Sequence, residues 1–468
     1  MGQHSGGRAA MNVGRWRLAS LLGVGIIALG LLLAMFGAPP WSDENGGGGS
    51  GAPGVYGDPS PPPGHPDAQV GWGFTHTRSS ADEGEDAARD RAAKLLSATR
   101  LPQNQHIMGW GADNPEPSPG KYDFDALDKR VETVRKSGGT PVITLCCAPD
   151  WMKDGGRAGS TDWSALEEAP SPRHFQDFAE LAGKVARRYP EVRHFLVWNE
   201  MKGFYDDASQ RWDASSYTRL YNLVHAELKK ADKDNLVGGP YAVMDSVAKS
   251  SHNASKVRGP WGALDQRSLD AVSYWNKHKK GADFAVVDGS SYTSDDRQLP
   301  DEFAATDKLA AVTRWVRGET RLPVWWAEWY VEVPDAKDER DGWSERHRAA
   351  VQASALMALA RSGAAAGFYW NPQNDGASCA GCLWRSTRLR DGGTPLPMLR
   401  LLSRFSREFP PGTHFTRVPV AKNDAPNVRV LADKDAVLVV NTLPRAIEAR
   451  VDGRTFAMKG HEVKWLNR

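Results

Sequence analysis

The chain has 468 residues, of which 40% are hydrophobic and 25% are charged. This length allows one large domain or two to three ordinary ones, and its 18 Trp, 11 Tyr and 14 Phe exclude a disordered chain. Because 59 basic residues stand against 57 acidic ones, the net charge of +2 creates no overall attraction for nucleic acid. The many tryptophans indicate a surface that stacks against flat, weakly polar molecules, and sugar rings fit that description.

An uncharged segment lies near the amino terminus at residues 18–38, after Arg8, Arg15 and Arg17. As a helix, its 21 residues would span roughly 30 Å, which is the thickness of a bilayer core. The arginines favour a cytoplasmic tail at residues 1–17. Because a cleaved signal peptide usually has a shorter apolar region, we predict an uncleaved transmembrane signal anchor. The protein would then be single-pass in the cell membrane with an extracellular folded part; secretion after signal cleavage is the alternative.

Residues 39–69 are rich in glycine and proline, which predicts a flexible linker that holds the following domain outside the membrane. The four cysteines are Cys146, Cys147, Cys379 and Cys382. In an oxidising compartment the pair Cys379 and Cys382 is a candidate disulfide, and free buried thiols or a zinc site are the alternatives.

Short apolar runs alternate with helical patterns over residues 70–410. The predicted strands are residues 70–75, 105–110, 140–146, 192–200, 236–243, 284–290, 322–329 and 365–371, and the intervening stretches have the periodicity of amphipathic helices. Eight strand-helix units predict an α/β chain with a closed (β/α)8 TIM barrel. The alternative, an open doubly wound sheet, would normally carry a glycine-rich phosphate turn after its first strand, and residues 71–76 lack the third glycine.

The pattern changes over residues 411–468 to short alternating runs. The predicted strands there are residues 413–420, 428–431, 436–441, 448–451 and 462–466. They predict a small, sandwich-like β domain at the carboxyl terminus. Its role would be structural, and a sugar-binding module is the alternative.

Two glutamates end predicted barrel strands. Glu200 ends the fourth strand after Trp198 and Asn199, and Glu328 ends the seventh among tryptophans. Because the carboxyl ends of all barrel strands meet at one mouth, we expect these two carboxyl groups to face one another. Cleavage of a glycosidic bond needs one protonated and one ionised carboxyl group. A structural ion pair with Lys or Arg is the alternative for each glutamate.

Glu200 is the predicted general acid/base, because burial beside Trp198 and the charge of Glu328 would raise its pKa. Glu328 is then the nucleophile, and Asn199 would donate a hydrogen bond to the substrate hydroxyl next to the reacting carbon. A separation of about 5 to 5.5 Å between the two carboxyl groups would give retention of configuration.

Several motifs together resemble one known group of enzymes. Trp198-Asn199-Glu200, Trp326-Ala327-Glu328-Trp329, residues 109–125 and Gly238-Gly239-Pro240 resemble clan A glycoside hydrolases, most of all glycoside hydrolase family 39, over about residues 70–404. The resemblance implies a retaining, β-xylosidase-like β-glycosidase with Glu200 as acid/base and Glu328 as nucleophile. It also implies that Tyr292 hydrogen-bonds the nucleophile. No cofactor or metal is expected.

The chain departs from this family directly after Glu200. Met201 and Lys202 follow, where the family usually has proline. Lys202 is placed either to alter the pKa of Glu200 or to bind an acidic sugar. The basic residue that the clan often has near the end of the second strand is not evident at residues 110–113.

Aromatic and polar side chains at other strand ends complete the predicted cleft. Tryptophan faces stack on the C–H surfaces of sugars, although ordinary packing is an equal alternative for any one of them. The predicted substrate-binding residues are His76, Trp110, Trp151, Asn199, Tyr292, Trp329, Trp370 and Asn371.

The sequence therefore favours a glycoside hydrolase that acts on a β-glycoside or polysaccharide, with a carbohydrate and the membrane as partners. A non-catalytic, membrane-tethered carbohydrate-binding protein is the alternative. A serine or zinc hydrolase on the same barrel is disfavoured because the chain has neither Gly-x-Ser-x-Gly nor His-Glu-x-x-His.

Overall fold

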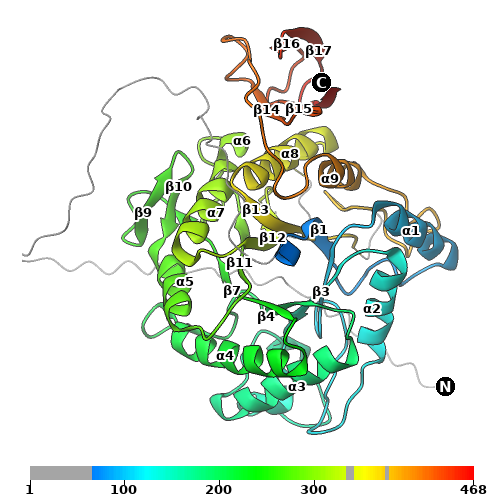
Figure 1. Ribbon diagram of the computed structural model, residues 1–468, viewed down its shortest axis with the longest axis vertical. Helices are drawn as coiled ribbons and strands as arrows, with labels where there is room; N and C mark the ends of the chain where they lie inside the picture. The colour runs from blue at the N-terminus through cyan, green and yellow to red at the C-terminus, as the bar shows by residue number, and fades with distance from the viewer. Residues whose placement is uncertain (1–65, 334–341, 375–378) are drawn as a thin grey trace, which may run out of the picture.

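Eight parallel strands close into a barrel in the computed structural model, which describes residues 66–333, 342–374 and 379–468 (Figure 1). The strands are β1 (Gly71–Thr75), β2 (Gln103–His106), β3 (Pro141–Leu145), β4 (His194–Val197), β7 (Leu236–Val243), β11 (Phe284–Ser290), β12 (Val324–Tyr330) and β13 (Ala364–Tyr369). They follow one another round the ring in chain order. The predicted (β/α)8 barrel is confirmed, and each predicted run overlaps its strand.

Helices surround the barrel on its outer side (Figure 1). They are α1 (Asp86–Thr99), α2 (Asp125–Ser137), α3 (Phe175–Arg188), α4 (Ala214–Ala231), α5 (Gln266–His278), α6 (Glu302–Ala305), α7 (Asp307–Thr320), α8 (Glu345–Arg361) and α9 (Pro397–Glu408). In α3, for example, Phe178, Leu181 and Val185 recur every three to four residues and are buried. This spacing places them on one face of the helix, which packs on the strands.

Smaller elements lie in the connections between the barrel units. They are β5 (Tyr205–Asp206), β6 (Arg211–Trp212), β8 (Ser246–Val247), β9 (Ala254–Gly259), β10 (Gly262–Asp265) and the 3-10 turns η1 (Pro66–Ala68), η2 (Asp150–Met152), η3 (Trp163–Ala165) and η4 (Pro172–His174). All five strands among them follow β4 or β7 in the chain.

The barrel interior is filled by large apolar side chains. Trp325 stacks on Phe284 with ring centroids 3.9 Å apart, and its indole N–H donates to the carbonyl of Ala68 at 2.7 Å. His194 makes a second bond, from Nε2 to the carbonyl of Asp67 at 2.8 Å. Residues 66–69, which we assigned to the linker, therefore belong to the folded barrel. Their proline-rich, polar sequence hides this packing, because their contacts use main-chain carbonyls.

The carboxyl-terminal part is β-rich, as predicted. Its strands are β14 (Val428–Ala432), β15 (Ala436–Asn441), β16 (Ile447–Val451), β17 (Arg454–Met458) and β18 (Val463–Asn467). One sheet has the order β14-β15-β18, and β16 pairs with β17. Trp465 of β18 packs against Phe409, 5.3 Å away, just after α9.

Two predicted features of this part are wrong. Residues 413–420 form no strand and contribute only an isolated bridge between Val420 and Val451. Conversely, β17 was not predicted, because most of its side chains are exposed and its apolar run is too short to stand out.

Two disulfides join Cys379 to Cys382 and Cys146 to Cys147. The first was the predicted candidate pair. The proposed anchor at residues 18–38 and residues 39–65 of the linker lie outside the described residues. Among the helices of the described ranges, none has the length and apolarity required to cross a bilayer.

Candidate active site

Three carboxyl groups meet where β4, β11 and β12 end. One oxygen atom each from Glu200, Asp288 and Glu328 lies within 4.8 Å of the other two. Asp288 is 2% exposed and Glu328 is 4% exposed, whereas the Glu200 side chain is 18% exposed. The structure thus brings together the two glutamates that the sequence analysis placed at one mouth, and it adds an aspartate.

A β-bulge in β12 turns Glu328 toward this cluster. Trp326 pairs with Val287 and Glu328 pairs with Asp288, so that Ala327 is an extra residue without a partner. The indole of Trp326 points outward and donates to Thr313 of α7 at 2.9 Å. Strict alternation would send Glu328 outward as well, and the extra residue reverses its direction.

A second bulge, in β7, delivers a hydroxyl group to Glu328. Val286 and Val287 of β11 pair with Pro240 and Ala242, so that Tyr241 is the extra residue, and its φ angle is 55°. Its hydroxyl donates to Glu328 Oε1 at 2.7 Å. The Tyr330 hydroxyl donates to Glu328 Oε2. Both carboxyl oxygens of Glu328 therefore accept a hydrogen bond, which favours the ionised form.

The backbone around the cluster is conformationally unusual. Trp198, Glu200, Met201 and Tyr241 are four of the ten non-glycine residues with positive φ in the described ranges. Such conformations are costly for side chains of this size and concentrate at functional sites. The turn after β4, in particular, aims Glu200 into the mouth instead of continuing the strand.

Lys202 determines the charge state of Glu200. Its ammonium nitrogen lies 2.9 Å from Glu200 Oε2 and 2.7 Å from Glu167 Oε1, above the ring of Trp110. Burial raises the pKa of Glu200, but the charge of Lys202 and a hydrogen bond with Asp288 lower it, and the net pKa lies below the usual value.

The pKa increase that we predicted for Glu200 is therefore wrong in this state of the protein. The indole of Trp198, to which we assigned part of the effect, does not cover the carboxyl group. It donates to the Lys202 carbonyl at 2.8 Å and packs against Phe178 and Phe204 in the core. The charge of Lys202 thus lowers the pKa of Glu200, and the Trp198 indole does not make the contact that was expected to raise it.

The other two carboxyl groups have raised pKa values. Burial and the charge of Glu200 raise the pKa of Glu328 to about 7, against the opposing effect of the two tyrosine hydroxyls. Burial and the charge of Glu200 raise the pKa of Asp288 well above its usual value. Three mutually repelling, buried carboxylates cannot all stay ionised without compensation.

Asn199 is held beside the cluster by a buried histidine. His106 Nε2 lies 3.5 Å from Asn199 Oδ1, and burial lowers the pKa of His106 to about 4. A neutral imidazole that donates to this oxygen leaves the amide nitrogen of Asn199 to donate elsewhere. This orientation suits the predicted hydrogen bond to a substrate hydroxyl.

Two tryptophans flank the same histidine. Trp110 and Trp370 are half-buried, and their rings lie 5.4 Å and 6.3 Å from that of His106. Asn371, also half-buried, accepts a hydrogen bond from Thr77 at 3.3 Å. The structure therefore places Trp110, Trp370 and Asn371 near the mouth, where the sequence analysis expected them.

Other predicted substrate ligands lie elsewhere. His76 is fully buried, and its ring nitrogens bond to Ser80 at 2.6 Å and Gln103 at 2.8 Å, which leaves neither for a sugar. Trp329 is fully buried and packs edge-on against Tyr369, because the bulge that turns Glu328 inward turns its neighbour outward. The predictions for His76 and Trp329 are wrong for these reasons.

Trp151, in the 3-10 turn η2, and Tyr292, in the loop after β11, are both half-buried. The Trp151 indole donates to the Glu116 carbonyl at 2.8 Å. The carbonyl of Tyr292 accepts from Ser290 and from Lys308. The tyrosine hydroxyls that the structure brings to Glu328 are those of Tyr241 and Tyr330.

The sequence analysis missed four residues of the site. They are His106, Tyr241, Asp288 and Tyr330. Asp288 lies two residues before the end of the predicted strand at residues 284–290, and Tyr330 directly follows the predicted strand at residues 322–329, so an argument from strand ends could have included them. Tyr241 has no comparable signal, because its direction depends on the bulge.

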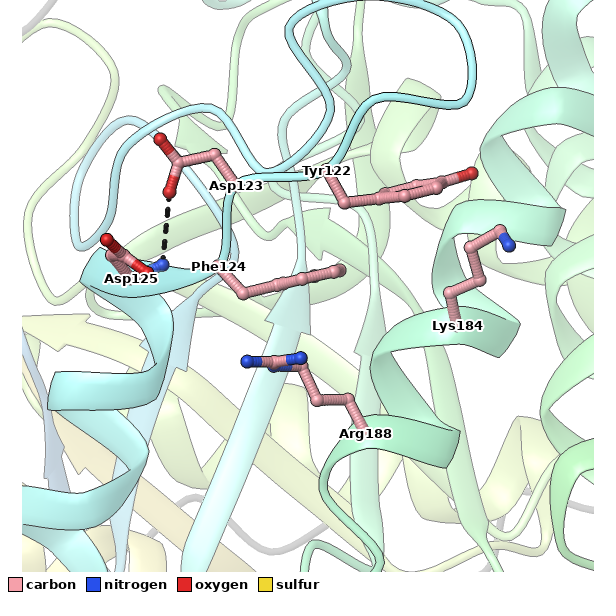
Figure 2. Close-up of a pocket in the computed structure, with 6 residues that line it drawn as sticks. All are labelled: Tyr122, Asp123, Phe124, Asp125, Lys184 and Arg188. Atoms are coloured by element: carbon pink, nitrogen blue, oxygen red, sulfur yellow. Dashed lines mark hydrogen bonds between the residues drawn. The ribbon is translucent and has the colours of Figure 1, made fainter.

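A separate hollow of about 620 Å³ lies on the surface between the start of α2 and α3 (Figure 2). Its rings, Tyr122 and Phe124, lie parallel at 5.9 Å. Lys184 lies over the ring of Tyr122 at 4.6 Å, and Arg188 over that of Phe124 at 4.8 Å. These cations occupy the ring faces on which a sugar would stack, so this hollow is a poor binding surface for a sugar.

Comparisons with known proteins identify the fold. The sequence matches no protein-family model and no curated protein. Among solved structures, it is similar to a family 39 glycoside hydrolase from Bacteroides cellulosilyticus WH2, with 14% identity and a TM-score of 0.54 over 86% of this chain and 81% of that one. At such identity the likeness is one of fold.

Two further structures are similar to the same extent. A β-xylosidase from Caulobacter crescentus shares 16% identity, with a TM-score of 0.51 over 82% of this chain and 74% of that one. A conserved exported protein from Bacteroides fragilis shares 13%, with a TM-score of 0.57 over 85% of this chain and 97% of that one. The fold of this chain is thus similar to that of the family which its motifs resemble.

The raised pKa of Glu328 makes a prediction about stability. A carboxyl group with a higher pKa in the folded state stabilises the fold below that pKa, and this contribution disappears as the pH rises through about 7. Glu328→Gln should therefore gain stability relative to the wild type between pH 5 and pH 8, by up to about 3 kcal/mol.

Urea unfolding at several pH values measures this difference. Glu448→Gln, on the exposed side of β16, is the matched control. A difference between Glu328→Gln and wild type that stays constant with pH would contradict the proposed environment of Glu328.

Proposed function

We propose that this protein is a retaining β-glycoside hydrolase that uses Glu328 as its nucleophile and Glu200 as its general acid/base. The observation that carries the proposal is the approach of the two carboxyl groups at the barrel mouth, with oxygens within 4.8 Å. Retaining enzymes hold their carboxyl groups about 5 to 5.5 Å apart, whereas inverting enzymes need about 6.5 to 9.5 Å to admit a water molecule. The close approach of the two carboxyl groups therefore favours double displacement.

The hydrogen bonds support the assignment of the two roles. A nucleophile must be ionised. Burial and the charge of Glu200 raise the pKa of Glu328 to about 7, and the two tyrosine hydroxyls that donate to Glu328 oppose this rise and fix the direction of its lone pairs. Glu200 has the more exposed side chain of the two, which suits contact with a leaving group that departs toward solvent.

In the first step, a Glu328 oxygen would attack the anomeric carbon while Glu200 protonates the departing glycosidic oxygen. In the second step, Glu200 would take a proton from water as the water oxygen displaces Glu328 from that carbon. Asn199 would donate to the neighbouring sugar hydroxyl, and this bond strengthens as positive charge develops on the ring.

The flanking residues suggest where the sugar would lie. Trp370 is half-buried beside His106, so that part of its ring is open to a ligand. Trp110 is also half-buried there, but the ammonium of Lys202 lies over its ring at 4.8 Å, which makes it the poorer platform. Lys202 is already paired with Glu167 and Glu200. An acidic sugar would have to displace one of these carboxylates, and we therefore assign Lys202 to the control of Glu200.

Activity measurements on two variants test the proposal. We expect Glu328→Gln to abolish hydrolysis of aryl β-glycosides, including the β-xyloside, while sugar binding persists. Glu200→Gln should retain cleavage of substrates with good leaving groups and lose about 10² to 10⁴-fold with poor ones, because only the latter need protonation. Proton NMR of the first-formed product should show the β-anomer.

Other outcomes would contradict the proposal. An initial α-anomer would indicate inversion. Binding of sugars without cleavage of any glycoside or polysaccharide would indicate the alternative, a carbohydrate-binding protein that has the fold of these enzymes without their activity.

We further propose that residues 18–38 anchor the protein in the cell membrane with the barrel outside, because this uncharged segment follows three arginines. Membrane fractionation of cells that express the full chain should recover it in the membrane pellet after a high-salt wash. A soluble mature protein that begins near Pro39 would show instead that the segment is a cleaved signal peptide.

A further inference from the structure

Asp288 is a third carboxyl group in a site whose proposed reaction needs two. It lies in β11, opposite Glu328 in the strand register, and is 2% exposed. One of its side-chain oxygens lies within 4.8 Å of an oxygen of Glu200 and of an oxygen of Glu328. Two ionised carboxylates can only accept hydrogen bonds, so a hydrogen bond between Asp288 and Glu200 needs a proton on one of them.

The three carboxyl groups have different surroundings. Glu328 is supplied with two hydroxyl donors. Glu200 carries the ammonium of Lys202 at 2.9 Å, which favours its ionised form. Asp288 has one side-chain oxygen that is buried without a hydrogen-bond partner, and a neutral carboxyl group tolerates this better than a charged one.

Charged and titratable groups face Asp288 from several barrel units. These groups are Glu200 after β4, Tyr241 in β7, Asp245 after β7, Glu328 and Tyr330 in β12, and Lys308 in α7. The three carboxyl groups raise the pKa of Asp288 in addition to the effect of burial. Lys308 opposes them, and burial lowers its own pKa to about 8.

We propose that Asp288 holds the proton that Glu200 delivers to the leaving group, so that the two carboxyl groups work as one acid/base pair. This inference rests on the proposed function of the site. Asp288 holds this proton for Glu200 and does not itself contact the substrate. It is therefore a positioning residue that acts through Glu200.

The proton and electron transfers balance without any further reactant. The O–H bond of Asp288 breaks as an O–H bond forms on Glu200, and Glu200 then passes this proton to the glycosidic oxygen. That oxygen keeps the electron pair of the breaking C–O bond, while Glu328 forms its bond to the anomeric carbon. In the second step, a proton from water returns to the pair.

The pair also accounts for Lys202, two residues after Glu200. Lys202 alone would keep Glu200 ionised and make it a poor acid. A proton stored on Asp288 restores the acid, and Lys202 stabilises the two carboxylates that remain after the proton has left.

Asp288→Asn tests the proposal, because the amide can still donate to Glu200 but cannot supply a proton. With poor leaving groups we expect kcat/KM to fall about 100-fold or more, and with a dinitrophenyl leaving group less than about 10-fold. The basic limb of the pH profile should move to lower pH, because Glu200 alone must hold the proton beside Lys202. Asp270→Asn, on the exposed surface of α5, is the control and should retain wild-type rates.

Equal losses with both leaving groups, or no loss with either, would overturn the role of Asp288. Should Asp288→Asn fail to fold, infrared spectra of the wild type at neutral pH provide the second test. A protonated carboxyl stretch that shifts on ¹³C labelling of aspartate supports the proposal, and its absence overturns it. Failure of the proposed function is distinguishable, because the wild type would then hydrolyse no glycoside at all.

Discussion

The site depends on one electrostatic constraint, the burial of three carboxyl groups with oxygens within 4.8 Å. Ionised groups at such distances repel strongly when water is excluded. Three features compensate: hydroxyl donors on Glu328, an ammonium beside Glu200, and burial that favours the neutral form of Asp288. The carboxyl groups are thereby driven toward different charge states, which acid/base and nucleophilic chemistry require.

The barrel supports this arrangement through departures from regular strand geometry. The bulges at Tyr241 and Ala327 point a hydroxyl and a carboxyl group at each other, although alternation along either strand would separate them. Below the site, Trp325 fills the interior and binds residues 66–69. A rigid, closely packed base of this kind holds the irregular upper ends of the strands in place.

Much of the fold was predictable, because strand-helix alternation follows from apolar periodicity alone. The exception is β2, which the sequence analysis placed at residues 105–110 and which runs from Gln103 to His106. Its four side chains are polar and all buried, and they form hydrogen bonds with residues outside the strand. Gln103, for example, is hydrogen-bonded to His76, which follows β1. Polar residues inside a barrel leave no hydrophobic signal to detect.

The two glutamates were predictable because strand ends meet at one mouth, whatever the details of packing. Their pKa values were not, because these depend on contacts between segments that are distant in sequence. Lys202 lies two residues from Glu200, yet whether it would contact that carboxyl group depended on a turn with positive φ. Likewise, no pattern in the sequence indicates that Trp198 packs into the core and that Tyr241 does not follow the alternation of β7.

The most direct measurement of the central claim is to trap the covalent intermediate. A 2-deoxy-2-fluoro-β-glycoside with a dinitrophenyl leaving group should inactivate the enzyme, and mass spectrometry of the digested protein should find one sugar on the peptide that carries Glu328. Attachment to the peptide of Glu200 or Asp288, or steady turnover of ordinary substrates with no adduct under any condition, would contradict the account.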